Sequence, residues 1–124
     1  MYKKETWEVE KMYTSYFGKM KKLPEGFVLV SISRTCPKGI KMKMYGKLAP
    51  SAELLRDYKS GQMSWEDYTE RYKSETLSKL NPQTVARELG DNVILMCYEK
   101  SEDNCHRHIV AEWLRNAGVN ISEY

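Results

Sequence analysis

Long apolar runs are missing from this sequence. No segment approaches the ~18 to 20 unbroken apolar residues that a membrane-spanning helix needs, so no membrane partner is expected. Residues 1–13, MYKKETWEVEKMY, are charged and have no apolar centre, so they do not resemble a secretory signal. Both absences predict a cytoplasmic protein.

Repeats, low-complexity tracts and recognisable linkers are also missing. A chain of 124 residues can bury one hydrophobic core but not two. Its composition, 41% hydrophobic and 30% charged, is that of a globular protein. The net charge of +3 is too balanced to indicate a nucleic-acid-binding protein by itself. We therefore expect one domain over residues 1–124.

Cysteine is scarce, with three residues at positions 36, 97 and 105. Because the number of cysteines is odd and the expected compartment is reducing, we expect free thiols. A disulfide between Cys97 and Cys105 is the alternative. Together with His106, the cysteines would supply suitable zinc ligands. However, none of them forms the C-x-x-C pair of structural zinc sites, and adjacent Cys105 and His106 make an awkward chelate. We expect no metal.

Several common catalytic motifs are absent. The loop of protein tyrosine phosphatases, a cysteine followed by five residues and an arginine, has no counterpart at Cys97 or Cys105. There is no G-x-S-x-G elbow to support a Ser/His/Asp triad, and no P-loop or dinucleotide-binding fingerprint. The sequence therefore gives no sign of a cofactor, and none is expected.

Two nearly continuous apolar runs are present. Residues 27–33, FVLVSIS, and residues 92–98, NVILMCY, are typical of strands buried on both faces of a sheet. Residues 11–16 are rich in aromatic and β-branched side chains and predict an earlier strand, although residues 9–17 also fit helical spacing. A short last strand is predicted at residues 119–121.

Helices are predicted over residues 52–60, 65–80, 82–89 and 108–117. Ser51 and Ser64 are expected to cap the first two, and Pro82 suits the first turn of the third. Trp65 and Tyr68 lie on the buried stripe of the second helix, where packing in the core is favoured over an aromatic cage. This order of elements predicts an α/β fold with a small, mostly parallel sheet flanked by helices. A helical segment is expected between its second and third strands.

The unusual residues gather where such folds bind ligands. In parallel α/β sheets, ligands bind beyond the carboxyl ends of the strands. The strand at 27–33 runs into Arg34 and Cys36, and the next apolar strand ends at Cys97. The chain then returns through residues 104–107, which read Asn-Cys-His-Arg. If the two strands are neighbours, all three cysteines lie around one crevice.

The phase of the last helix predicts which of these side chains face the sheet. Its apolar stripe consists of Ile109, Val110, Trp113, Leu114 and Ala117. Cys105 and His106 lie one turn before this stripe and extend it inward, whereas His108 falls on the outward, solvated side. We therefore predict that His106 is the functional histidine. Asp103 or Asn104 is expected to cap the helix.

The first turn of that helix is electrically positive, because its backbone N–H groups point outward. This favours a thiolate at Cys105 and disfavours the cation of Arg107. Arg107 therefore needs an anionic partner. Glu99 in the same loop would suit, and so would a bound phosphate or other oxyanion.

Residues 94–114, ILMCYEKSEDNCHRHIVAEWL, resemble the C-terminal signature of the family known as domain of unknown function 488. In that signature an apolar strand runs into a Leu-Cys-aromatic-Glu element, and Cys-His-Arg opens the following helix. The stretches YTSYFG, LVSISRTCP and KLAPSAELLRDYKSGQMSWEDYTERY are similar to its short-chain branch. The resemblance spans roughly residues 12–123 and implies a small α/β protein, without implying a known reaction.

The resemblance maps the family motif onto Cys97, Glu99, Cys105, His106 and Arg107. A familial Arg-x-x-Pro element matches Arg34 and Pro37. Cys36, which lies inside that element, is peculiar to this sequence, and this weakens a metal site built from three cysteines.

The leading hypothesis is an enzyme whose crevice binds an anionic small molecule, such as a nucleotide or nucleobase derivative. The candidates for holding the anion are Arg34, Lys38 and Arg107. The catalytic candidates are Cys97, Glu99, Cys105 and His106. In this enzyme Cys105 would act as nucleophile or redox thiol, and His106 or Glu99 would transfer protons.

Two other hypotheses stay open. One is a non-catalytic module that binds a nucleotide or nucleic acid with the same crevice. Residues 38–47, KGIKMKMYGK, carry four lysines and no acid, and such a segment either attracts anions or forms a solvated edge. The other is purely structural, with Cys97 and Cys105 filling the core while Glu99 and Arg107 pair to hold the loop.

Overall fold

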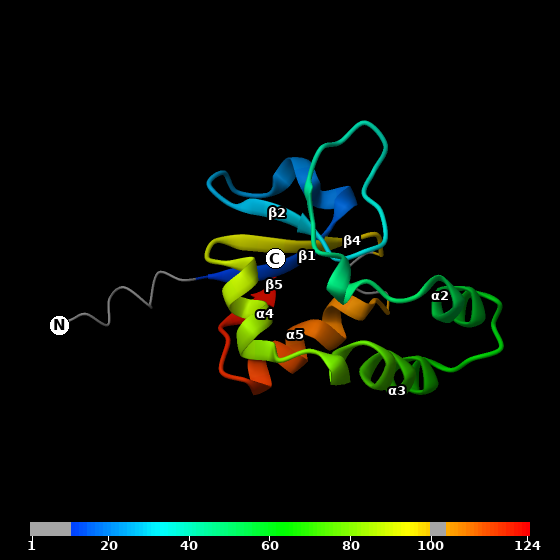
Figure 1. The fold of residues 1–124 in the computed structure, drawn as a ribbon. Helices are drawn as coiled ribbons and strands as arrows, with labels where there is room; N and C mark the ends of the chain where they lie inside the picture. The colour runs from blue at the N-terminus through cyan, green and yellow to red at the C-terminus, as the bar shows by residue number, and fades with distance from the viewer. Residues whose placement is uncertain (1–10, 100–103) are drawn as a thin grey trace.

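A computed structural model describes residues 11–99 and 104–124 of the chain, and within them it contains a five-stranded parallel sheet (Figure 1). The strands are β1 (Met12–Tyr16), β2 (Val28–Ser31), β3 (Lys43–Met44), β4 (Val93–Cys97) and β5 (Ile121–Glu123). Their order across the sheet is β3-β2-β4-β1-β5. With the helices around this sheet, the predicted α/β fold is confirmed, and residues 12–16 form a strand rather than a helix.

Strand β4 lies in the middle of the sheet, between β2 and β1, and all of its residues are buried. Val93 and Leu95 belong to the larger hydrophobic core on one face. Ile94 and Met96 belong to a smaller core on the other face. A parallel strand covered on both faces needs apolar side chains at successive positions, which is why a continuous apolar run identified this strand in the sequence.

The described α-helices are α2 (Ala52–Lys59), α3 (Trp65–Glu75), α4 (Pro82–Leu89) and α5 (His106–Asn116). All of them contribute buried side chains to the larger core. The opposite face of the sheet is covered by the 3-10 helix η1 (Phe17–Lys22) and by the loop that follows β2. In Figure 1, α2 and α3 lie beyond the carboxyl ends of the strands, which brings them close to the start of α5.

The predicted helix starts are confirmed by the caps. The hydroxyl oxygen of Ser51 accepts a hydrogen bond from the backbone N–H of Leu54 at 3.0 Å, and that of Ser64 accepts one from Asp67 at 3.0 Å. Each serine therefore pairs one of the backbone donors that the first turn of its helix leaves without an intrahelical partner. Pro82 lies in the first turn of α4, as predicted.

Three stretches differ from the prediction. The helix expected over residues 65–80 ends at Glu75 and is followed by the 3-10 helix η3 (Leu77–Lys79). The lysine-rich segment, residues 38–47, contains the exposed edge strand β3 and runs into the 3-10 helix η2 (Gly46–Leu48). Neither element was predicted, because neither contains a run of apolar residues. The last strand lies two residues later than predicted because its pairing with β1 begins at Ile121.

Among the described residues, no helix combines the length and the apolar character required to cross a lipid bilayer.

Candidate functional site

Cys97 and Cys105 lie at the carboxyl edge of the sheet. Cys97 is the last residue of β4, and Cys105 is the N-cap residue of α5. The two are joined by a disulfide and are buried, with 0% and 3% of their surface exposed. The sequence left a Cys97–Cys105 disulfide as an alternative, and the structure contains it. The expectation that these two cysteines stay as free thiols is wrong.

Cys36 does not share this site. It is a free cysteine that packs in the smaller core, on the face of the sheet opposite to α5. Its thiol donates a hydrogen bond to the backbone carbonyl of Ile40 at 3.3 Å. The prediction that three cysteines surround one crevice is wrong, because the loop after β2 folds over the face that η1 covers.

The start of α5 also differs from the prediction. The N-cap residue is Cys105, which makes no side-chain cap hydrogen bond. Asp103 lies outside the described residues, and the amide of Asn104 donates to the hydroxyl of Tyr58 at 3.4 Å instead of capping the helix. Asn104 therefore connects the start of α5 to α2.

His106 is buried and held in one tautomer. Its Nε2 atom lies 2.7 Å from the backbone carbonyl oxygen of Ile32, and a carbonyl can only accept, so Nε2 carries the hydrogen. The other ring nitrogen, Nδ1, is then unprotonated and lies 3.7 Å from Sγ of Cys105. Burial first, and then the neighbouring charges of Arg107 and His108, lower the pKa of His106 to about 4, against the opposing effect of its hydrogen bond to Ile32. The imidazole is therefore neutral at neutral pH.

His106 faces inward, as predicted from the helix phase, and is 5% exposed. His108 is half-buried, so the expectation that it is solvated holds only in part.

Arg107 is fully buried, and its guanidinium contacts several groups at once. Its Nη2 and Nε atoms lie 2.8 and 3.2 Å from the two carboxylate oxygens of Glu123. Its Nη1 atom donates to the backbone carbonyl of Glu99 at 2.6 Å and to Sγ of Cys97 at 2.9 Å. The ring of Tyr16 lies 5.7 Å from the guanidinium. The arginine thus connects the β4–α5 loop to the last strand.

The anionic partner of Arg107 is Glu123 rather than Glu99. The requirement for such a partner was read correctly from the positive start of the helix. Glu99 contributes only its backbone carbonyl, while its side chain points elsewhere. Glu123 was missed because nothing in the sequence places the last strand beside β1 and so within reach of α5.

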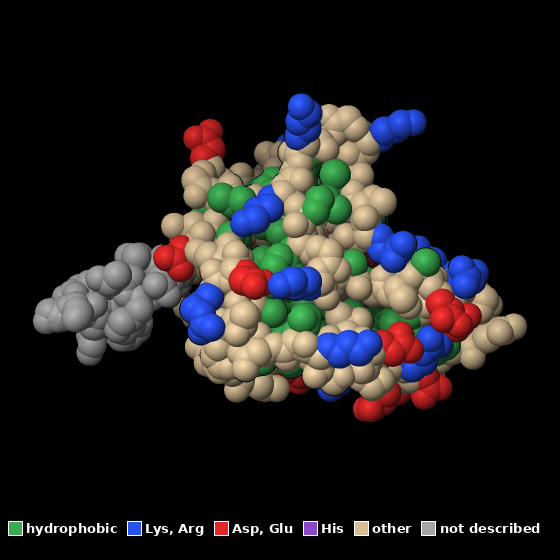
Figure 2. Space-filling model, viewed as in Figure 1, with side chains coloured by type: hydrophobic (Ala, Val, Ile, Leu, Met, Phe, Trp, Pro, Cys, Tyr) green, Lys and Arg blue, Asp and Glu red, His purple; other side chains and the backbone are tan. Residues whose placement is uncertain are grey.

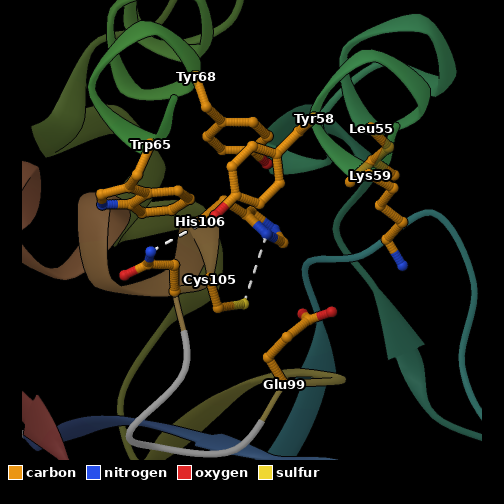
Figure 3. Close-up of a pocket in the computed structure, with 9 residues that line it drawn as sticks. Leu55, Tyr58, Lys59, Trp65, Tyr68, Glu99, Cys105 and His106 are labelled. Atoms are coloured by element: carbon orange, nitrogen blue, oxygen red, sulfur yellow. Dashed lines mark hydrogen bonds between the residues drawn. The ribbon is translucent and has the colours of Figure 1, made fainter. Parts of the chain in front are cut away.

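A pocket of about 460 Å³ opens beside Cys105 and His106 (Figure 3). This volume falls in the range of small-molecule sites, ~300 to 1,000 Å³. Its lining residues are Leu55, Tyr58, Lys59, Trp65, Tyr68, Glu99, Asn104, Cys105 and His106. The residues come from α2, α3, the loop after β4 and the start of α5, so the pocket lies at the carboxyl edge of the sheet, where ligands are expected in this fold.

Three aromatic rings form one wall of this pocket. Trp65 and Tyr68 stack with their centroids 4.9 Å apart and their planes at 13°, and Tyr58 lies 5.1 Å from Tyr68. Burial, and then the charge of Glu99, raises the pKa of Tyr68 far above its usual value, so its hydroxyl stays protonated. Tyr68 is buried in the core, as predicted, and with Trp65 it also lines the pocket, an arrangement closer to the aromatic cage that the sequence favoured less than core packing.

Residues 12–118 match the profile of a protein family, DUF488-N3a, which is described as the active DUF488-N3 subclade. The chain belongs to this family. The match confirms the resemblance seen in the sequence, and it covers Cys97, Glu99, Cys105, His106 and Arg107 but not Glu123. No curated protein and no solved structure matches the chain.

The cationic residues proposed from the sequence do not gather at the pocket of this DUF488-N3a member. Arg34 and Lys38 are exposed on the loop after β2, and Arg107 is buried against Glu99 and Glu123. None of the three lines the pocket. Among the residues that the structure describes, the cationic side chain that lines the pocket is that of Lys59 in α2. Lys59 is far from the Cys-His-Arg motif in the sequence, so no local pattern predicted this position.

The sulfur atoms of Cys97 and Cys105 and a ring nitrogen of His106 lie within 4.8 Å of one another. Such a set of two thiolates and an imidazole could hold a soft metal ion once the disulfide is reduced. The adjacent positions of Cys105 and His106, noted from the sequence as awkward for chelation, do not keep these atoms apart.

Proposed function

We propose that this DUF488-N3a protein is an enzyme that acts on an anionic small molecule with a planar ring, in the class of nucleotide and nucleobase derivatives. The observation that carries the proposal is the pocket in which Cys105 and His106 lie beside a wall of aromatic rings, with Lys59 at the edge. A planar ring can stack on Trp65, and a phosphate or carboxylate can pair with Lys59.

The reacting group in this proposal is the sulfur of Cys105, in its reduced form. The unprotonated Nδ1 atom of neutral His106 is aimed at that sulfur and would accept its proton. The thiolate would then attack an electrophilic centre of the bound molecule. The proton that His106 has accepted would then pass to the leaving group, directly or through the carboxylate of Glu99, whose side chain lines the same pocket.

The anion contact falls to Lys59 rather than to the arginines. Arg107 already has Glu123 and Glu99 as partners and is fully buried, so a ligand could reach it only by displacing them. Arg34 and Lys38 do not line the pocket.

Replacing Lys59 with alanine is expected to raise the Kd for adenosine monophosphate about fivefold, because a solvent-exposed ion pair contributes at most ~1 kcal/mol. The Kd for adenosine, which lacks the phosphate, should stay unchanged. Isothermal titration calorimetry gives both values. Lys73→Ala is the matched control, because Lys73 is exposed on α3 and does not line the pocket. An equal loss for nucleoside and nucleotide would remove Lys59 from the anion site.

Replacing Trp65 with alanine is expected to raise the Kd for both adenosine and adenosine monophosphate about tenfold, because base stacking contributes ~1 to 3 kcal/mol. Trp113→Ala is the control, since Trp113 packs on the same core but does not line the pocket. Thermal unfolding of both variants separates lost binding from lost folding. Unchanged affinity in the folded Trp65 variant would contradict a stacking role.

The alternative function is a nucleic-acid-binding module that uses the lysines of residues 38–47. Lys38, Lys41, Lys43 and Lys47 are all exposed. However, Lys47 pairs with Glu88 at 3.2 Å, and Figure 2 shows basic side chains on this face interspersed with acidic ones rather than in one stripe. Strong binding of single-stranded DNA that weakens steeply with salt, and that is lost when these lysines become glutamine, would favour the alternative.

A further inference from the structure

We propose that Cys97 is the resolving thiol of Cys105, and that the site exchanges its disulfide with small-molecule thiols. The inference rests on the proposed function in one respect: both place the reacting sulfur at Cys105, inside the pocket. It adds a role for Cys97 and a second class of substrate.

The two sulfurs of the bridge have different surroundings. Cys105 lines the pocket, together with His106 and Glu99, whereas Cys97 ends the central strand and does not line it. Figure 3 shows the sulfur of Cys105 on the pocket side, close to the ring of His106. A thiolate that enters the pocket can therefore approach the sulfur of Cys105 but not that of Cys97.

The surroundings also decide which sulfur leaves. The Nη1 atom of Arg107 donates a hydrogen bond to Sγ of Cys97 at 2.9 Å. A charged donor stabilises negative charge on its acceptor, and a stabilised thiolate leaves faster in thiol–disulfide exchange. Both features point in one direction, with attack at Cys105 and departure of Cys97.

The exchange needs no group beyond the incoming thiol. The thiol enters as its thiolate R–S⁻, having lost its proton to solvent, and attacks Sγ of Cys105 to form the mixed disulfide R–S–S–Cys105. The bond between Cys105 and Cys97 breaks, and its electron pair stays on Cys97 beside Arg107. A second thiolate then attacks the sulfur of R, which releases R–S–S–R and the thiolate of Cys105. Two thiols are oxidised to one disulfide, and the bridge is reduced by two electrons.

The reverse sequence closes the site. A small disulfide, R–S–S–R, is attacked by the thiolate of Cys105, which forms the mixed disulfide and releases R–S⁻. Cys97 then attacks Cys105 and releases a second R–S⁻, so the bridge reforms. Because the proposed enzyme requires Cys105 as a thiol, this exchange also sets whether the pocket is ready to react.

Trapping experiments test the direction of the exchange. Cys36→Ser serves as the background, since Cys36 lies on the other face of the sheet. The reduced Cys97→Ser and Cys105→Ser variants in this background are mixed with bis(2-hydroxyethyl) disulfide, and adducts are located by peptide mass spectrometry. We expect a lasting adduct on Cys105 in the Cys97→Ser variant, and an adduct on Cys97 at least tenfold more slowly in the other. In the background protein the adduct should disappear as the bridge closes.

Equal trapping rates at the two cysteines, or an adduct that persists in the background protein, would overturn the inference. If the Cys105→Ser variant does not fold, the oxidised background protein is treated with limiting 2-mercaptoethanol and quenched with acid. The mixed disulfide should then be found on Cys105, and its appearance on Cys97 would contradict the proposal.

The outcome is separable from that of the proposed function. Trapping at Cys105 without binding of adenosine monophosphate supports thiol exchange and rejects the nucleotide-like substrate. Nucleotide binding together with trapping at Cys97 rejects the inference and leaves the proposed substrate class in place.

Discussion

Replacing Arg107 with alanine is expected to lower the free energy of unfolding by about 3 to 5 kcal/mol, the usual cost of breaking a buried ion pair by removing one partner. Arg107 is 0% exposed and pairs with both carboxylate oxygens of Glu123. Its removal takes from that carboxylate the two hydrogen bonds of the guanidinium, and from the carbonyl of Glu99 the hydrogen bond of Nη1.

Urea unfolding, followed by circular dichroism, measures this loss. Arg71→Ala is the matched control: Arg71 also pairs with two carboxylates, those of Asp57 and Glu75, but on the surface of α3. Exposed pairs contribute little, so the control should lose less than ~1 kcal/mol. If both variants lose equally little, the arginine of the Cys-His-Arg motif does not hold the loop in place, and a ligand-binding role for Arg107 would regain support.

A large loss of stability in Arg107→Ala would mean that the arginine of the Cys-His-Arg motif has a structural role. Arg107 holds Cys97, Glu99 and Glu123 in one network, and its position next to His106 in the sequence does not bring it into the pocket. The structural hypothesis drawn from the sequence is therefore partly right for Arg107. The same motif nevertheless aims His106 and Cys105 at a pocket, so one short segment combines a residue that holds the loop with two that can react.

The fold could be predicted from the sequence because its determinants are local. The apolar runs of β2 and β4, the serine caps of α2 and α3, and Pro82 at the start of α4 each act within a few residues. The inward direction of His106 followed from helix phase alone. Each of these features depends on the chain near it, so a single sequence was sufficient.

The rest of the site depends on which distant segments come into contact. Such contacts cannot be predicted from local patterns in a single sequence. Glu123 reaches Arg107 because β5 pairs with β1, and Lys59 reaches the pocket because α2 lies beyond the sheet. Cys36 was assigned to the wrong face for the same reason, since its loop could close toward either side. The local rules placed Cys105 and His106, and the long-range packing decided their neighbours.

Lowering the pH from 6.5 to 4 is expected to lower the free energy of unfolding by about 3 kcal/mol through His106 alone. Burial lowers the pKa of His106 from 6.5 to about 4 in the folded protein. Between these values the unfolded chain binds a proton that the folded chain does not, so protonation favours unfolding. The stabilising effect of the neutral imidazole is complete above pH 6.5 and disappears as the pH falls to 4.

Urea unfolding at a series of pH values measures this dependence, and His106→Gln isolates it. Glutamine cannot titrate, but its amide can still donate a hydrogen bond to the carbonyl of Ile32. Acid also protonates carboxylates, among them Glu88, whose pKa is lowered by its hydrogen bonds to Tyr45 and Lys47. That contribution is common to both proteins, so the difference between their pH profiles belongs to His106.

His108→Gln provides the control on the same helix, because the chain has only these two histidines. It should keep most of the pH dependence of the original protein, since His108 is half-buried and contributes to the low pKa of His106 only as a nearby charge. If the free energy of unfolding of His106→Gln still depends steeply on pH while that of His108→Gln does not, the pH dependence comes from His108 and not from His106. His106 would then be protonated near neutral pH, and its Nδ1 atom could not take a proton from a thiol in the pocket.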